Sequence, residues 1–333
     1  MLKVGLLGAG RIGRVHAPNV AGHPGSTLAA VSDVHAPAAE ALAARHGAAA
    51  RTTDEILDDP SIDAVLVATS TDTHADLVER ATAAGKAVLC EKPVDLSLAR
   101  ARACQAAAER SGRPVMVGFN RRFDADFAAL RAALDRGEAG RPELLSIASF
   151  DPGPPPLDYI AVSGGLFRDM MIHDLDIATF LMRDAPVAVA AVASALVDPA
   201  IGEAGDVDTA VVTLRYADGR IAVIRNSRRA AFGYDQRVEL LGSEGMLEIG
   251  NRLETTLRRS DAGGVTGAKP LHFFLERYER AYAAEWDAFV GALAEDRPVP
   301  VTLADGVAAL ALAEAASRSA GADGRPVALA EVG

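Results

Sequence analysis

The sequence has few cysteines and no long apolar run, and both absences narrow the kind of protein that it encodes. Its 333 residues include two cysteines, Cys90 and Cys104, and neither lies in a CxxC pair or a metal-ligand pattern. We therefore expect no disulfide scaffold, no metal and a reducing compartment. No apolar run reaches the roughly 18 residues that a membrane helix needs, and the chain begins directly with a strand-like segment. These features predict a cytoplasmic protein without a membrane partner.

Positive charge is also scarce. Lysine and arginine total 34 against 45 aspartates and glutamates, which gives a formal net charge of -11. The nearest approach to a basic cluster is Arg225 with Arg228 and Arg229, a group typical of a solvated strand end. Because nucleic acid binds to concentrated positive charge, a nucleic-acid partner is not expected. The only lysines are Lys3, Lys86, Lys92 and Lys269.

The first 118 residues alternate short apolar segments with amphipathic helical ones. The apolar segments are rich in β-branched residues and lack polar alternation, as expected of strands buried on both faces of a parallel sheet. Strands are expected at 3–7, 28–32, 64–68, 87–90 and 115–118, and helices near 12–21, 36–46, 73–84 and 97–110. Such alternation predicts that residues 1–118 form an α/β domain with a doubly wound, Rossmann-type parallel sheet.

Residues 119–333 follow a different pattern, which predicts a second domain. A proline-rich loop runs from Asp151 to Pro156, and strand-like segments then follow one another from 187 to 258 without intervening helices. Consecutive strands of this kind favour an antiparallel sheet. Helices are expected near 124–137, 166–182, 275–294 and 303–319. The second domain is therefore predicted to be α+β, with an open, mainly antiparallel sheet.

A glycine-rich turn follows the first predicted strand. Gly8-Ala9-Gly10-Arg11-Ile12-Gly13 matches GxGxxG, and the next helix begins inside it. Gly8 allows the tight turn, Gly10 lets the backbone approach a pyrophosphate, and Gly13 lets the helix pack closely on the strand. The amides at the helix N-terminus then face the phosphates. A glycine turn without a ligand is the alternative, but the strand–turn–helix context favours a dinucleotide site.

Asp33 indicates which dinucleotide is bound. It lies 20 residues past Gly13, at the end of the second predicted strand. A carboxylate in this position accepts hydrogen bonds from the adenosine ribose and repels a 2′-phosphate. Val34 and His35 follow, and neither is the arginine that would receive that phosphate. The sequence therefore predicts NAD rather than NADP, the alternative being that Asp33 is only a turn residue.

Two further segments carry ionisable residues suited to chemistry. Glu91-Lys92-Pro93 follows the fourth predicted strand, and doubly wound sheets bind ligands beyond the carboxyl ends of their strands. Lys92 is thus expected near the nicotinamide, although a surface turn has the same pattern. In the helix expected over 166–182, Asp169 and His173 are four residues apart and share one face. This pair, in a helix otherwise rich in apolar residues, is a candidate for catalysis.

Together these motifs resemble those of the Gfo/Idh/MocA oxidoreductase family. The glycine turn, Glu91-Lys92-Pro93 and the Asp-xxx-His helix have the family's order and spacing across nearly the whole chain. Longer similar stretches are closest to members that oxidise cyclitols, and they lie at 118–124, 151–160, 163–174, 201–209 and 233–237. The resemblance implies a Rossmann domain, a second domain with an open antiparallel sheet, NAD as cofactor and a homo-oligomer. One departure is Asp72, where many members have asparagine.

The resemblance also implies the residues of the site. The expected cofactor-binding residues are Gly8, Gly10, Arg11, Ile12, Gly13, Asp33, Thr69, Ser70, Thr71, His74, Glu91 and Lys92. The expected substrate-binding residues are Lys92, Arg121, Asp151, Asp169, His173, Tyr234 and Tyr282. For Tyr234 and Tyr282 a packed aromatic is an equal alternative. Arg122 is left out of the site because it also suits an ion pair.

The implied reaction transfers a hydride from a hydroxyl-bearing carbon of a polyol to NAD. The cofactor carries the hydride, so the protein has to orient the alcohol and take its proton. His173 is the expected base because an imidazole titrates near neutral pH, and Lys92 would donate to the developing alkoxide. The reverse assignment of Lys92 and His173 stays open. Asp169 is expected to contact a neighbouring hydroxyl and to hold the other two residues in place.

Other functions fit parts of this pattern. The same enzyme class could act on another cyclitol, an amino-cyclitol or an aldose. A family member that retains its NAD could use it in an internal redox cycle without net NADH production. A non-catalytic NAD-binding regulator would be expected to have lost Lys92, Asp169 and His173, which are all present.

The sheet of the second domain also predicts self-association. Its β-branched residues include Val211, Val212, Ile221, Val223 and Ile224. A sheet with so many apolar positions is expected to bury a face against another subunit. We therefore expect a homo-oligomer, with a tetramer favoured over a dimer.

Overall fold

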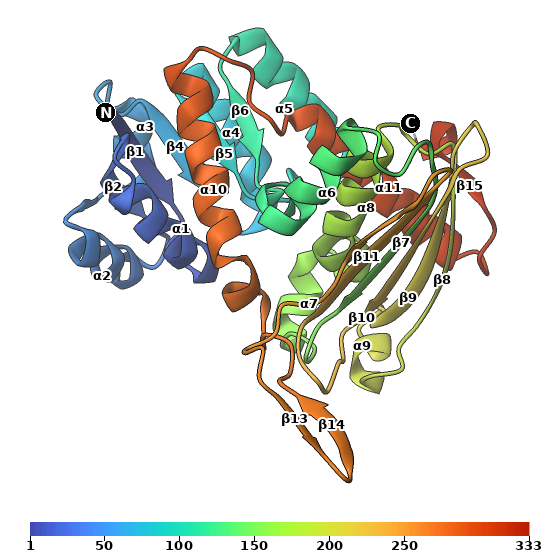
Figure 1. Cartoon of the computed structure of the whole chain (residues 1–333). Coiled ribbons are helices and arrows are strands. Elements are labelled where there is room, and N and C mark those ends of the chain that lie inside the picture. Colours follow the sequence, from blue (N-terminus) through green and yellow to red (C-terminus); the bar gives the residue numbers. More distant parts are fainter. Residues whose placement is uncertain (333) are drawn as a thin grey trace. The chain divides into compact units, whose positions relative to one another are not determined.

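A computed structural model describes residues 1–332, and the chain divides into two compact units (Figure 1). The first comprises Met1–Phe123 together with Arg280–Leu310, and the second comprises 124–279 together with the chain from 311 onward. The assignment of 280–310 to the first unit differs from the predicted division at 118. Its reason is packing, since the buried Trp286 donates its indole N–H to Ser26 Oγ at 3.0 Å.

The first unit contains a six-stranded parallel sheet in the order β3-β2-β1-β4-β5-β6. This is the strand order of the dinucleotide-binding Rossmann fold, so the predicted α/β fold class is confirmed. The strands are β1 Leu2–Leu7, β2 Ser26–Ser32, β3 Ala49–Ala50, β4 Ala64–Val67, β5 Ala87–Cys90 and β6 Val115–Val117. Only β3 was not predicted, because two alanines carry no strand pattern.

Helices flank this sheet, four of them where the amphipathic segments predicted them and one, at 53–58, that was not predicted. They are α1 Arg11–Gly22, α2 Ala36–His46, α3 Thr53–Asp58, α4 His74–Ala83 and α5 Leu98–Ser111, with 3-10 turns η1 Thr71–Thr73 and η2 Asn120–Phe123. Gly112 ends α5 with φ +68°, a conformation that favours glycine. Two long helices, α10 Phe274–Ala294 and α11 Leu303–Ala320, each continue from one unit into the other. Among the described residues no helix is both long and apolar enough to cross a bilayer.

The second unit contains a seven-stranded sheet in the order β12-β11-β7-β10-β9-β8-β15. Every neighbouring pair is antiparallel except β7 and β10, so the predicted mainly antiparallel sheet is confirmed. The strands are β7 Pro142–Phe150, β8 Ala188–Ser194, β9 Thr209–Arg215, β10 Ile221–Ser227, β11 Asp235–Gly242, β12 Met246–Ile249 and β15 Val327–Ala328. The central strand β7 was not predicted.

The remaining elements of this unit are helical, apart from one hairpin. The helices are α6 Ala125–Asp135, α7 Leu157–Ser163, α8 Ile172–Met182 and α9 Pro199–Glu203, with a π-helical turn η3 Phe167–Met171 and a 3-10 turn η4 Leu329–Val332. The helix predicted over 166–182 is therefore present, but its first turn is wider than an α-helix. An exposed hairpin of β13 Arg258–Asp261 and β14 Gly264–Gly267 extends away from the sheet (Figure 1).

The two faces of the seven-stranded sheet have different surroundings. Val212 and Ile224 are fully buried on the face that α8 covers. Val211 and Ile221 point the other way and are 47% and 41% exposed. Of the β-branched residues predicted to meet another subunit, Val212 and Ile224 therefore belong to this unit's own core. The period-2 alternation of a strand explains the division.

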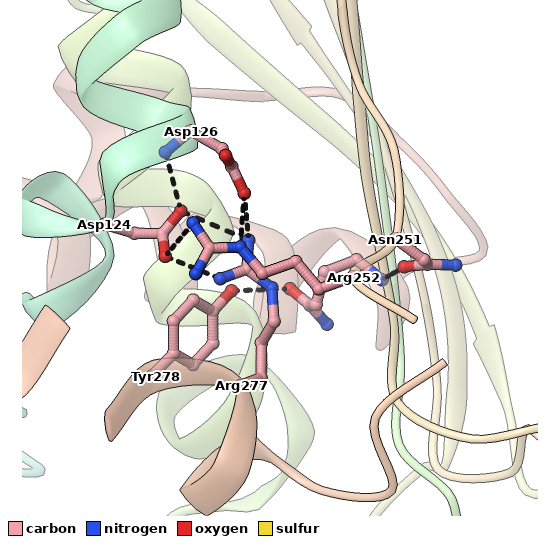
Figure 2. Close-up of polar contacts among 7 residues, drawn as sticks. Asp124, Asp126, Asn251, Arg252, Arg277 and Tyr278 are labelled. Atoms are coloured by element: carbon pink, nitrogen blue, oxygen red, sulfur yellow. Dashed lines mark hydrogen bonds and ion pairs between the residues drawn. The ribbon is translucent and has the colours of Figure 1, made fainter. Parts of the chain in front are cut away.

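A buried ion network joins α6 to the start of α10 (Figure 2). The Arg277 guanidinium donates to both carboxylate oxygens of Asp124, at 2.5 and 3.1 Å, and each side chain is 2% exposed. Asp124 also caps α6 by accepting the Asp126 N–H. Arg252 donates to Asp126 at 2.8 Å from the chain segment after β12. The network therefore ties three separate segments of the second unit together.

Replacing Arg277 by methionine should destabilise the protein, because it leaves the Asp124 carboxylate buried without its counter-charge. Loss of one partner from a buried pair costs about 3–5 kcal/mol. Urea unfolding should show this loss, and Arg277→Met combined with Asp124→Asn should recover part of it. If the free energy of unfolding of Arg277→Met lies within about 1 kcal/mol of the wild-type value, the pair is not needed for stability.

Candidate functional site

The residues predicted to bind the dinucleotide follow the ends of adjacent strands. The register of the parallel sheet aligns the last residues of β2, β1, β4 and β5. The residues that follow these strands are, in the same order, Asp33, Gly8, Ala68 and Glu91, so they lie along one edge of the sheet. In doubly wound sheets this carboxyl edge is where ligands bind.

The glycine turn has the backbone geometry that a pyrophosphate needs. Gly8 has φ +106°, and a Cβ on it would lie 2.3 Å from the Ala68 carbonyl oxygen. A Cβ on Gly13 would lie 2.0 Å from the Gly8 carbonyl oxygen, whereas one on Gly10 would meet nothing within 4 Å. Gly8 and Gly13 thus permit close packing, and Gly10 leaves the backbone open to a ligand. No described side chain caps the N-terminus of α1, which leaves that end suited to phosphate oxygens.

Asp33 is fixed against the glycine turn. Its Oδ2 accepts the Ala9 N–H at 2.6 Å, and its Oδ1 accepts the His35 N–H at 2.8 Å. A carboxylate oxygen has two lone pairs, so each oxygen retains one for a ribose hydroxyl. Together with the glycine turn, this arrangement fits the adenosine end of NAD.

The segment from Thr69 to His74 is held by internal hydrogen bonds. The hydroxyls of Thr69 and Thr73 lie 2.7 Å apart, and His74 begins α4 as predicted. The His74 imidazole is buried, and its Nδ1 lies 2.8 Å from the Pro93 carbonyl oxygen. Burial lowers the pKa of His74, so the ring is neutral. His74 therefore joins this segment to the residue after Lys92, and its contact with the cofactor stays a prediction, as do those of Thr69, Ser70 and Thr71.

Glu91 directs its carboxylate into the protein. Oε1 lies 2.7 Å from Nε2 of His16, a buried residue of α1, and Oε2 accepts the Lys92 backbone N–H at 3.3 Å. Glu91 was predicted to bind the cofactor, and that role stays untested by these contacts. Sequence patterns did not single out His16, although it lies three residues after Gly13 on the same helix.

In the second unit, Asp169 lies in the π-helical turn that precedes α8. Its Oδ1 accepts the hydroxyl of Tyr159 at 3.0 Å, and Oδ2 lies 3.5 Å from a guanidinium nitrogen of Arg228. π-Helical turns are rare and often occur at functional sites. Arg228 is buried, so the interpretation of this residue as part of a solvated strand end was wrong. The basic triplet gave no signal that its middle member turns inward.

His173 is the second residue of α8, one turn after Asp169. The next residue, Asp174, is buried and accepts hydrogen bonds from Ser149 Oγ at 2.6 Å and Asn226 Nδ2 at 2.8 Å. These bonds fix the start of α8 to β7 and β10. Asp174 is therefore a structural residue that sets the position of its half-buried neighbour His173.

The other predicted substrate residues have mixed surroundings. Arg121 is buried in η2, and Asp151 is half-buried after β7. Tyr234 packs edge-on against Tyr278 and Phe273, and Tyr282 packs edge-on against His16. These three contacts fit packed aromatics, the alternative considered for both tyrosines, and their contact with a substrate stays a prediction. Arg122, which was left out of the site, pairs with Asp305 at 3.0 Å.

Comparison with known proteins identifies the class of protein that this fold and these residues define. The model of the oxidoreductase family with an NAD-binding Rossmann fold matches residues 2–119, and that of the GFO/IDH/MocA C-terminal domain matches 127–248. The chain therefore belongs to the Gfo/Idh/MocA oxidoreductase family. It is an enzyme that uses NAD, and the glycine turn and Asp33 fit that cofactor.

Several individual members of the family are similar to this chain over nearly its whole length. The chain is 50% identical to the inositol 2-dehydrogenase of Rhizobium meliloti (strain 1021), with 96% of each chain covered. It is 44% identical to the myo-inositol 2-dehydrogenase of Thermotoga maritima, again with 96% of each covered. Its structure matches that of the scyllo-inositol dehydrogenase from Lactobacillus casei with bound NAD(H) and scyllo-inositol, with a TM-score of 0.92 and 27% identity over 99% of each chain.

Proposed function

We propose that the protein oxidises myo-inositol to scyllo-inosose (2-keto-myo-inositol) by transferring a hydride to NAD. The observation that carries this proposal is the 50% identity with an inositol 2-dehydrogenase over 96% of both chains. The relative from Thermotoga maritima is a myo-inositol 2-dehydrogenase. The long stretches that resemble this kind of enzyme, among them 151–160 and 163–174, support the same substrate.

The chemistry is assigned to Lys92, Asp169 and His173. Bound NAD supplies the hydride acceptor, and the chain's own residues orient the alcohol and take its proton. His173 acts as the base, and Lys92 donates a hydrogen bond to the same oxygen as negative charge develops there. Lys92 as the base with His173 as the donor is the alternative assignment.

Asp169 accepts a hydrogen bond from a neighbouring hydroxyl of the substrate. Its contacts with Tyr159 and Arg228 support this role, because each of them orients one of the two carboxylate oxygens. A polyol needs several such contacts, since each buried hydroxyl without a partner costs about 1–3 kcal/mol. Arg121 and Asp151 are the next candidates to supply them.

Another polyol is the second candidate substrate. The neighbour from Lactobacillus casei has scyllo-inositol bound, which favours that isomer as the alternative. chiro-Inositol, amino-cyclitols and aldoses such as glucose would use the same catalytic groups. The isomers differ only in the direction of individual hydroxyls, so the residues around Asp169 would decide among them.

We also propose that the protein is a homo-oligomer, with a tetramer favoured. An apolar row crosses the uncovered face of the seven-stranded sheet, because the register places Met246, Leu241, Leu144 and Ile221 side by side on β12, β11, β7 and β10. Each is at least 38% exposed in the single chain. An apolar row of this kind is typical of an interface between subunits.

Sedimentation velocity should test the apolar row. The wild type is expected to sediment as an oligomer, and Leu241→Lys should reduce its mass by placing an unpaired charge in the interface. Val162→Lys is the matched control, since Val162 is 64% exposed on α7 and lies outside the row. A monomeric wild type, or equal masses for both variants, would show that this face of the sheet does not form a subunit interface.

The substrate proposal is tested by following NADH formation with a panel of cyclitols and sugars. We expect rapid NADH formation with myo-inositol, slower formation with glucose, and little reduction of NADP because Asp33 would repel the 2′-phosphate. Equal use of NAD and NADP would mean that Asp33 is only a turn residue and does not select the cofactor. If NAD binds but no inositol yields NADH, the substrate is wrong, and amino-cyclitols, other sugars or a retained-NAD redox cycle become the candidates.

Replacing either Lys92 or His173 by alanine should lower kcat by about two orders of magnitude or more while NAD still binds. The reason is that each side chain would contact the reacting oxygen and neither would hold the adenosine end of the cofactor. Steady-state kinetics together with NAD titration by fluorescence measure both effects. A variant with near-normal turnover would exclude that residue from the chemistry.

A further inference from the structure

Three ionisable side chains meet in the interior of the first unit. His16 comes from α1, Glu91 follows β5, and Glu285 comes from α10. One ligand-type atom from each lies within 4.8 Å of the others, and all three residues are buried. Below, they are called the His16–Glu91–Glu285 cluster. Glu91 directly precedes Lys92, so this cluster lies immediately behind a residue assigned to the chemistry.

Glu91 is the member of the cluster that is held on two sides. His16 Nε2 lies 2.7 Å from one of its carboxylate oxygens, and the backbone N–H of Lys92 donates to the other at 3.3 Å. Gly118 packs against this carboxylate, and a Cβ added to Gly118 would lie only 3.2 Å from the Glu91 Cδ and Oε2 atoms. Through Glu91, the helix of the phosphate-binding turn is therefore connected to the backbone that carries Lys92.

Glu285 differs from Glu91 because neither of its carboxylate oxygens has a hydrogen-bond partner among the described residues. Burial, and then the nearby charge of Glu91, raise the pKa of Glu285 well above its usual range. Burial therefore favours the uncharged form of Glu285.

A metal ion would be a different use of the same three residues. Two ligands of one tetrahedral zinc ion, each about 2.1 Å from it, lie roughly 3.4 Å apart. The separation of 2.7 Å between His16 Nε2 and Glu91 is instead a hydrogen-bond length. The geometry therefore favours a hydrogen bond between His16 and Glu91 over a metal.

We propose that Glu91 is a positioning residue for Lys92, and that the hydrogen bond from His16 holds Glu91 in the orientation that fixes the Lys92 backbone. This inference rests on the proposed role of Lys92 in hydride transfer. It gives the glutamate of the Glu91-Lys92-Pro93 motif a task that needs no contact with the cofactor.

The test compares two substitutions of His16 that differ in hydrogen bonding. His16→Gln keeps a donor near the position of Nε2, whereas His16→Leu keeps similar volume without one. His16→Leu should lower kcat about tenfold, because displacing a reacting group by a fraction of an ångström has effects of this order. His16→Gln should stay within about threefold of the wild type. KM for NAD should change little in either variant, and the pH profile of kcat should shift only in His16→Leu.

Two further variants serve as control and as replacement. Glu285→Gln resembles a protonated glutamate in size and charge, so its kcat should be unchanged. If His16→Leu does not fold, Glu91→Gln takes its place and should show the same fall in kcat, because its neutral amide accepts weaker hydrogen bonds. Thermal unfolding of all variants separates loss of folding from loss of positioning.

A second readout does not depend on the substrate. The chain has only four lysines, so acetylation of Lys92 can be followed by mass spectrometry with the exposed Lys3 as an internal reference. His16→Leu should change the rate at Lys92 several-fold relative to Lys3, and His16→Gln should not. This measurement remains informative if the wild type oxidises no inositol, an outcome that would overturn the proposed function alone.

Three results would overturn the positioning role. One is equal kcat and equal Lys92 labelling in His16→Leu and His16→Gln. Another is a fall in kcat in Glu285→Gln as large as that in His16→Leu. The third is stoichiometric metal in the purified wild type that is lost in Glu285→Gln, which would make the His16–Glu91–Glu285 cluster a metal site.

Discussion

The cofactor site depends on one close approach between two backbone segments. At Gly8 the first strand turns directly against the carbonyl of Ala68, and only the absence of a Cβ allows it. Gly13 also has to lack a Cβ, because it places α1 directly against the Gly8 carbonyl. With these contacts made, the N-terminus of α1 lies at the carboxyl edge of the sheet, and Asp33 can accept the Ala9 N–H from the neighbouring strand end. The orientation of α1 in turn decides where His16 meets Glu91.

The second unit orients its functional side chains in another way, through buried polar groups. Asp174 binds Ser149 and Asn226 on two strands, which fixes the start of α8. Arg228 and Tyr159 contact the two oxygens of Asp169. In both units the residue assigned to the chemistry therefore has a neighbour that is held by hydrogen bonds inside the protein. Such supporting groups limit the motion of the side chain that has to meet the substrate.

Much of the fold could be predicted from the sequence, because it rests on local patterns. The apolar segments before Gly8, Asp33 and Lys92 predicted three strands of the Rossmann sheet, and glycine spacing identified the dinucleotide turn. What could not be predicted depends on contacts between distant segments. The inward turn of Arg228, the bond from His16 to Glu91 and the π-helical turn at Asp169 have no local signal. For the same reason, the sequence did not indicate that 280–310 packs with the first unit, since the contact between Trp286 and Ser26 joins distant segments.

The path of α10 has a consequence for how this fold can be divided or recombined. The helix runs unbroken from Phe274 to Ala294, yet its residues up to Glu279 belong to one unit and those from Arg280 to the other. A Rossmann module cut out at residue 118 would lack Trp286, the partner of Ser26, and would expose core surface. Residues 1–118 are therefore not expected to fold as an independent domain that could be moved into another protein. Exchange of cofactor domains between relatives would need three matched crossover points, near residues 123, 279 and 310.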